Sequence, residues 1–200
     1  MTRLKTLLVG LSTACAIGAA QARERVFIMD GHSGALSFSC DVMGVMPVEG
    51  AFTRFIAVIT IDETQPHDAR AVVKVDANSL QTDELDWVAD LKGPDFFDTA
   101  AYPEFGFASY AAFVEGPGLL RLDGMLTLRG QSKPVSLRVR YEAPDAPGGP
   151  AEISADAEVE RSAFGMNAYD LVLADEVEIA VTGEARPGFP PPVAVLSAIP

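Results

Sequence analysis

The feature that most constrains the fold is a regular alternation of apolar and polar residues. Every odd position from 135 to 141 is apolar and every even one is polar, and residues 152–160 repeat this pattern. Side chains of a β-strand point alternately to its two faces, so each run predicts a strand with one buried and one solvated face. Further strands are expected at these ranges: 25–29, 34–41, 51–62, 70–77, 104–113, 120–128 and 176–182. Eight or more such strands predict an all-β sandwich or barrel.

One segment departs from the strand pattern. Leu85, Val88 and Leu91 have helical spacing within residues 83–91, and Gly93-Pro94 follows as a stop signal. We expect a short helix that packs over the open end of the sheet. The run from Phe55 to Ile61 is apolar on both faces, so alternation does not orient it.

The chain begins with a segment typical of exported proteins. Arg3 and Lys5 precede an uncharged apolar run over 7–20, and Ala20-Gln21-Ala22 offers a small-residue cleavage site. This pattern predicts a secretory signal peptide over residues 1–22, cut after Ala22, and hence a periplasmic protein. A domain over 23–186 would follow, and then a proline-rich tail over 187–200 that is extended or disordered.

Composition excludes several classes of function. The formal net charge of −13 disfavours nucleic acid as a partner. Two histidines cannot build a multi-histidine metal site, and removal of residues 1–22 would leave Cys40 as the one cysteine. Nucleophile-elbow and phosphate-loop signatures are missing from the sequence, so we expect neither catalytic residues nor a metal, and no enzyme.

Several motifs, taken in order, resemble the YceI-like family of exported bacterial lipid-binding proteins. The motifs are Asp30-Gly31-His32-Ser33 with Phe38, Gly44 and Gly50-Ala51-Phe52; Ser79-Leu80-Gln81-Thr82; Gly93-Pro94-Asp95-Phe96-Phe97-Asp98 with Tyr102-Pro103 and Phe105; Gly124-Met125-Leu126-Thr127-Leu128-Arg129-Gly130 with Lys133-Pro134-Val135; and Arg161-Ser162-Ala163-Phe164-Gly165-Met166 with Asp175-Glu176-Val177. The resemblance implies an extended, lipocalin-like, eight-stranded antiparallel β-barrel. It also implies a polyprenyl lipid or isoprenoid quinone held without a covalent bond. Two positions depart from the family pattern: Val42 stands where members often have histidine, and Trp87-Val88 where they have Arg-Asp.

Strand parity within such a barrel selects the candidate ligand-binding residues, with His32 added as a polar group at the mouth. They are His32, Leu36, Phe38, Phe105, Phe107, Leu126, Leu137, Val139, Ala155, Ala157 and Ile179. His32 can equally be a turn residue. Arg161 is expected to pair with a carboxylate. The small residues Gly124, Ala155 and Ala157 either leave room for a tunnel or complement large side chains opposite them.

These observations favour a periplasmic carrier for an isoprenoid lipid. The alternative is a structural or interaction module whose barrel core is filled, and an accessory protein for quinone redox chemistry comes third. The sequence leaves open whether the protein forms a homodimer and whether it has a membrane or redox partner.

Export can be tested directly. If residues 1–22 are a signal peptide, N-terminal sequencing of the periplasmic protein should begin at Arg23. An intact Met1 on cytoplasmic material would contradict this prediction, and a diacylglyceryl group on Cys15 would make the protein a lipoprotein instead.

Overall fold

The structure is a computed structural model that describes residues 24–62, 64–83 and 85–188. The predicted signal peptide and residues 189–200 of the tail lie outside this range. The described strands are β1 (Glu24–Asp30), β2 (Gly34–Val42), β3 (Met46–Phe52), β4 (Phe55–Asp62), β5 (Arg70–Asp76), β6 (Leu80–Gln81), β7 (Glu104–Gly116), β8 (Leu119–Leu128), β9 (Gln131–Glu142), β10 (Ala151–Glu160) and β11 (Leu173–Pro187). The helices are α1 (Leu85–Lys92) and three 3-10 turns, η1 (Pro66–Asp68), η2 (Ala77–Ser79) and η3 (Arg161–Phe164).

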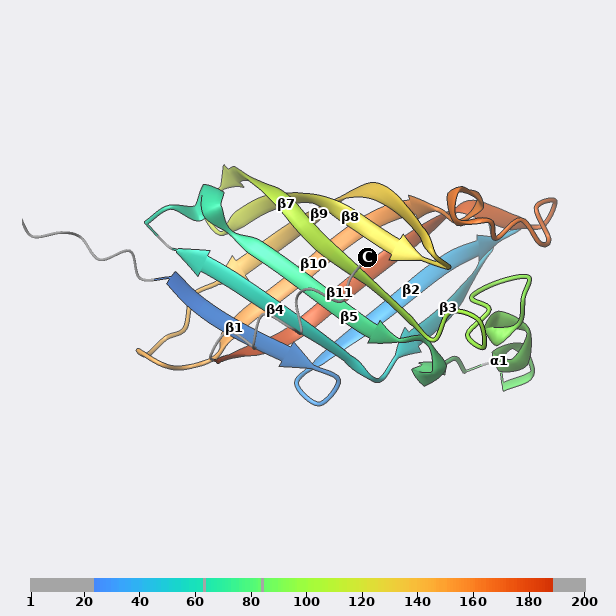
Figure 1. Ribbon diagram of the computed structural model, residues 1–200, viewed down its shortest axis with the longest axis horizontal. Helices are drawn as coiled ribbons and strands as arrows, with labels where there is room; N and C mark the ends of the chain where they lie inside the picture. The colour runs from blue at the N-terminus through green and yellow to red at the C-terminus, as the bar shows by residue number, and fades with distance from the viewer. Residues whose placement is uncertain (1–23, 63, 84, 189–200) are drawn as a thin grey trace, which may run out of the picture.

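The strands close into an antiparallel barrel with eight strand positions, as predicted. Three of these positions are each occupied by two consecutive strands. β1 and β2 both run antiparallel to β11, with Phe27 opposite Pro187 and Gly34 opposite Gly183. In the same way, β3 and β4 share one position of the barrel, and β5 and β6 share another. Sequence neighbours are therefore spatial neighbours around the whole ring (Figure 1).

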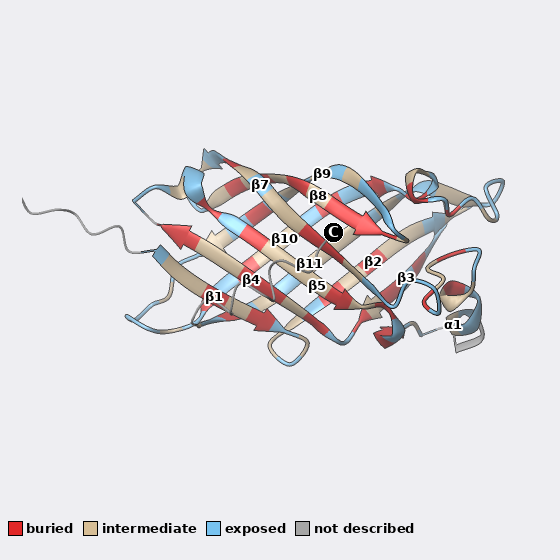
Figure 2. Cartoon of the chain, in the orientation of Figure 1, coloured by how far each residue is buried: buried red, intermediate tan, exposed pale blue. Residues whose placement is uncertain are grey.

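The interior follows the predicted parity. Phe27 and Met29 of β1 and Leu122 of β8 are almost fully buried, whereas the charged residues at even positions of β10 are exposed. Buried residues alternate with less buried ones along strands such as β8 and β10 (Figure 2). Burial of these apolar faces provides the main driving force for folding.

Two strand expectations need correction. The expected strand over 51–62 is two strands, and its first half begins earlier, at Met46. In β4 the odd positions Phe55, Ala57 and Ile61 belong to the core, which orients the run that alternation left undecided. The expectation that the tail from Pro187 onward does not pair as a strand is wrong for Pro187, which pairs with Phe27 of β1.

The predicted helix is confirmed as α1, which lies with the segment up to β7 at one end of the barrel (Figure 1, right). Leu91 is buried against the core and Trp87 is partly exposed. The helix ends before Pro94, because proline disfavours helical backbone in the residue before it. Backbone bonds from Phe97 to Leu91 O and from Thr99 to Lys92 O then fold the following turn back. The helices among the described residues are all too short or too polar to cross a membrane.

A buried arginine organises the same end of the barrel. Arg161 of η3 is 4% exposed, and its guanidinium donates to four backbone carbonyls. The acceptors are Met166 O at 2.6 Å, Ala168 O at 2.7 Å, Ala174 O at 2.8 Å and Leu173 O at 3.2 Å. In the part of the chain that the structure describes, Arg161 forms no ion pair, so the expected carboxylate partner is replaced by carbonyl dipoles. These bonds fix the segment that joins η3 to β11.

The segment that joins η3 to β11 has a second anchor at Ser162, the residue after Arg161. Ser162 donates its N–H to Asp175 Oδ1 at 2.8 Å and its hydroxyl to Asp175 Oδ2 at 2.7 Å. The hydrogen bonds from Ser162 lower the pKa of Asp175 below its ordinary value. The carboxylate therefore stays charged down to lower pH, and the anchor persists with it.

Replacement of Arg161 by methionine should destabilise the protein strongly. The change removes four charge-assisted hydrogen bonds from a buried position, at a cost of about 2–4 kcal/mol. Thermal unfolding should show a melting temperature lower by roughly 5–10 °C. Arg138→Met is the matched control, because Arg138 pairs with Asp156 at 3.0 Å on an exposed face. That pair should contribute about 0–1 kcal/mol. Equal effects of the two substitutions would contradict the role assigned to Arg161.

Candidate functional site

A cavity of about 370 Å³ lies inside the barrel at the end that carries α1 and η3. Its walls come from the strands on one side and from α1 and the two neighbouring loops on the other. The lining residues are Leu36, Ser37, Phe38, Cys40 and Val42 of β2; Val48 and Phe52 of β3; Trp87, Asp90 and Leu91 of α1; Phe96, Phe97 and Phe105; Leu126 and Leu128 of β8; Val159; Arg161, Met166, Tyr169 and Val172; and Leu173, Val177 and Ile179 of β11. Most of these side chains are apolar, which is typical of sites for small apolar ligands.

Four phenylalanines form one side of the cavity. Phe52 is central: its ring centroid lies 4.8 Å from that of Phe105, 5.3 Å from that of Phe97 and 5.8 Å from that of Phe38. Two of these pairs are edge-on, and each such pair contributes about 0.5–1.5 kcal/mol beyond its buried area. This wall is therefore preformed. Gly50 makes room for it, because a Cβ there would lie 2.4 Å from Phe38 Cζ.

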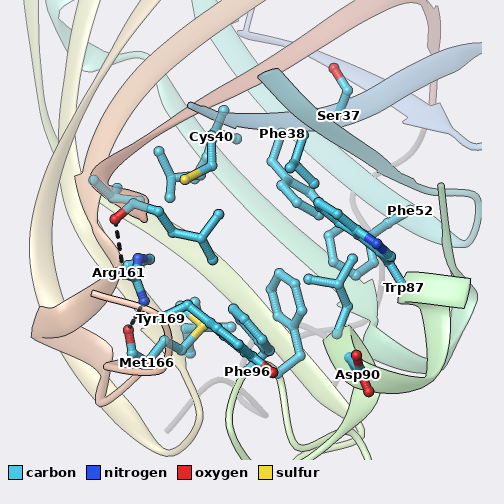
Figure 3. A pocket seen from close by; sticks show the side chains of 18 of the residues that line it. Ser37, Phe38, Cys40, Phe52, Trp87, Asp90, Phe96, Arg161, Met166 and Tyr169 are labelled. Carbon is cyan, nitrogen blue, oxygen red and sulfur yellow. Dashed lines mark hydrogen bonds between the residues drawn. The ribbon is translucent and has the colours of Figure 1, made fainter. Parts of the chain in front are cut away.

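The opposite wall carries the polar atoms of the interior. Cys40 and Arg161 lie across the cavity from Phe52 and Trp87 (Figure 3). The Cys40 thiol donates to Ala174 O at 3.2 Å, and burial raises the pKa of this thiol above its ordinary value. At least four of the five N–H groups of Arg161 are already directed at carbonyls. Both groups are thus largely satisfied by the protein itself.

The mouth lies between α1 and the loop before β11. Trp87 is 38% exposed and Tyr169 59% exposed, and both side chains line the cavity. The ring of Phe96 stacks on that of Tyr169, with centroids 6.0 Å apart and planes 10° apart. Asp90 of α1 also lines the cavity and is exposed. A ligand in this site would have its buried part among aromatic rings and its outer part near solvent.

Five of the candidate residues from sequence line this cavity: Leu36, Phe38, Phe105, Leu126 and Ile179. Leu137, Val139 and Ala155 instead pack into a core cluster without lining the cavity. Ala157 is buried opposite Ile179 without lining the cavity. Inward parity was therefore correct for these residues, but parity does not distinguish a cavity wall from a filled core.

Phe107 does not line the cavity, and its ring packs against Gly124 of the neighbouring strand. It lies in a separate cluster with Leu126 and Phe164, and a Cβ on Gly124 would lie 2.3 Å from Phe107 Cζ. Gly124 thus complements a large side chain, which decides between the two interpretations of the small residues at this position.

His32 lies outside the cavity as well. It belongs to the turn between β1 and β2, with its side chain 95% exposed and its N–H donating to Asp30 Oδ1 at 2.9 Å. Gly31 of this turn approaches the Thr53 carbonyl so closely that a Cβ would lie 1.9 Å from the oxygen. The motif at 30–33 is explained by turn geometry, and its histidine sits at that turn.

Sequence reasoning missed the loop residues of the cavity. Met166, Tyr169 and Val172 lie outside the regular strand pattern, so parity has no bearing on them. Val42 and Trp87 are the two places where the sequence departs from the family pattern given by the resemblance, and both line the cavity. That departure was a signal that could have pointed to them.

Part of the interior is filled by packed side chains. Phe27, Met29, Leu122 and Val139 are buried in one cluster and line no part of the cavity. A second, more open hollow at the far end is lined by residues such as Val114 and Tyr141, and it shares no lining residue with the cavity. The interior is thus neither a through-tunnel nor a fully packed core.

Comparisons with known proteins agree with this architecture. A UPF0312 protein of Vibrio cholerae is 30% identical over 139 residues, which are 68% of this chain and 74% of the relative. The crystal structure of BcnA from Burkholderia cenocepacia superposes with a TM-score of 0.70 at 24% identity, covering 78% of this chain and 98% of BcnA. A polyisoprenoid binding domain from Saccharophagus degradans, implicated in plant cell wall breakdown, superposes with a TM-score of 0.58 at 11% identity, covering 83% of this chain and all of that domain. These structural likenesses concern the fold. The model of the YceI-like domain matches residues 27–185, so the chain belongs to the YceI-like family.

Proposed function

We propose that the protein is a non-catalytic periplasmic carrier that holds the apolar chain of an isoprenoid lipid in the cavity. The observation that carries this proposal is a preformed cavity of about 370 Å³ inside the barrel, walled mainly by aromatic and aliphatic side chains. The polyisoprenoid-binding domain of Saccharophagus degradans has the same fold and supports the choice of ligand class.

The size of the cavity sets how much chain it holds. At about 30 Å³ per water-sized unit, it accommodates at least roughly a dozen such units. Burial of about a dozen chain carbons contributes on the order of 10 kcal/mol before the costs of association. That is sufficient for stable binding without any hydrogen bond to the chain. A longer chain would extend through the mouth past Trp87 and Tyr169.

The interior favours a ligand whose buried part lacks strongly polar groups. Val42 and Trp87 make this cavity more apolar than the family pattern implies. Arg161 and Cys40 are bonded to backbone carbonyls and offer little to a head group. A polar head, such as a quinone ring, would then lie at the mouth, where Asp90 and the Tyr169 hydroxyl are near solvent.

Organic extraction followed by mass spectrometry tests the proposal. The protein purified from the periplasm should yield close to one prenyl lipid per chain. Val177→Phe should abolish this lipid and leave the fold intact, because Val177 lines the cavity and the added ring fills empty space.

Val139→Phe is the matched control for that experiment. Val139 is 6% exposed, belongs to a packed core cluster and does not line the cavity, so the same substitution overpacks the core. It should cost about 1–3 kcal/mol without a specific loss of lipid. Well-folded wild-type protein that is free of lipid and takes up no added prenyl quinone would overturn the proposal and favour the interaction-module alternative.

Cys40 provides an independent measure of occupancy. Because burial raises the pKa of its thiol, alkylation by a small maleimide should be slow at pH 7 and should still accelerate as the pH passes 9.0. A bound chain would cover this thiol, so removal of lipid should speed alkylation at least tenfold. The control is Ser39→Cys in a Cys40→Ser background, since Ser39 directly precedes Cys40 in β2 and lines no part of the cavity. The alkylation rate of this control cysteine should be the same with and without lipid. If the alkylation rate of Cys40 also does not change when lipid is removed, the ligand binds elsewhere.

A further inference from the structure

Apolar side chains gather in the solvent around the mouth of the cavity. The turn between β2 and β3 carries Met43 and Val45, which are 74% and 85% exposed, and Met46 at the start of β3 is 62% exposed. The loop before β11 carries Tyr169, Leu171 and Val172, which are 59%, 95% and 39% exposed. We refer to these six residues as the apolar rim. Isolated exposed apolar residues are common, but a group of this size marks an interaction surface.

The two halves of the apolar rim are joined to each other and to the mouth. The Met43 N–H donates to Val172 O at 2.7 Å, so the turn and the loop form one surface. Tyr169 and Val172 line the cavity, whereas Val45 and Leu171 do not. The latter two are the most exposed members of the rim. Neither the core nor the cavity therefore accounts for them.

The charge around the rim defines the surface that it fits. Residues 42–47 carry no charge, and Asp170 is the one charged residue within 166–174. The chain as a whole has a net charge of −13. The acidic chain that carries this rim is repelled by anionic lipids and by other acidic surfaces, including a second copy of itself. The rim suits an uncharged apolar environment beneath zwitterionic head groups, where exposed Met, Leu, Val and Tyr side chains partition favourably.

We propose that the apolar rim inserts into the interface of a lipid bilayer and holds the mouth of the cavity against it. This inference rests on the proposed function, because docking would let a chain that is insoluble in water pass directly between the bilayer and the cavity. Docking by the rim would place the opening between Trp87 and Tyr169 at the level of the acyl chains. The barrel would then stand on the membrane at the end that carries α1 and η3 (Figure 1).

Vesicle flotation tests the docking. The purified protein should float with phosphatidylcholine vesicles and float less with vesicles that contain phosphatidylglycerol, a difference that 0.5 M salt should reduce. The double variant Val45→Asp, Leu171→Asp should lower the bound fraction on phosphatidylcholine at least tenfold. Val114→Asp is the matched control, because Val114 is 53% exposed at the opposite end of the barrel. It should bind vesicles like the wild type.

A second readout separates docking from ligand binding. The double variant should take up a prenyl quinone from detergent micelles with unchanged affinity and should extract it from phosphatidylcholine vesicles at least tenfold more slowly. Wild-type protein that binds the quinone from micelles but does not float would overturn the docking and leave the proposed function standing. Equal losses for the rim variant and Val114→Asp would also overturn it. So would a dimer in sedimentation that the rim variant converts to monomer without any effect on flotation, since the rim would then be a subunit interface.

Discussion

Closure of the barrel through β11 is the constraint on which the rest of the structure depends. This strand pairs with β10 along one side and with β2 and then β1 along the other, which brings the two ends of the domain together. Once the ring is closed, the inward faces of all strands share one interior, and the side chains at each level decide whether it is filled. Gly183 and Gly34 lie opposite each other at the junction of β1 and β2, where a Cβ on Gly183 would lie 2.4 Å from Gly34 Cα.

Within that ring the two ends are built differently. Large side chains from facing strands meet around Phe27 and Leu122, and neither residue lines the cavity. The cavity end includes loops that strand pairing does not support. Arg161 supplies the missing support, because its guanidinium holds three carbonyls of the 166–173 segment as well as Ala174 O. A buried charge whose hydrogen bonds all go to backbone carbonyls thus keeps the cavity wall in place.

Alternation in the sequence predicted most strands and their inward faces, and the family resemblance added the closed barrel, but the boundary between β3 and β4 and the orientation of β4 came from the structure. Alternation could not predict where the interior is empty. Val139 and Ile179 both point inward, yet one is packed and the other lines the cavity, because this depends on side chains from other strands at the same level. Phe107 and Gly124 show the same dependence across a strand pair. Loop residues such as Met166 and Tyr169 carry no periodic signal, and the outcome for Arg161 depended on carbonyls that only the folded loop assembles.

The separation of the two hollows also has a kinetic consequence. The cavity shares no lining residue with the hollow at the other end of the barrel, so it does not pass through the molecule, and the opening at Trp87 and Tyr169 serves both entry and exit. A second lipid cannot push the first one out ahead of it, so the bound molecule must leave before another can enter. Exchange would then proceed at the dissociation rate of the first lipid, whatever the concentration of its replacement. The architecture suits a protein that releases one lipid before it takes up the next, and it does not suit a channel through which lipids pass one after another.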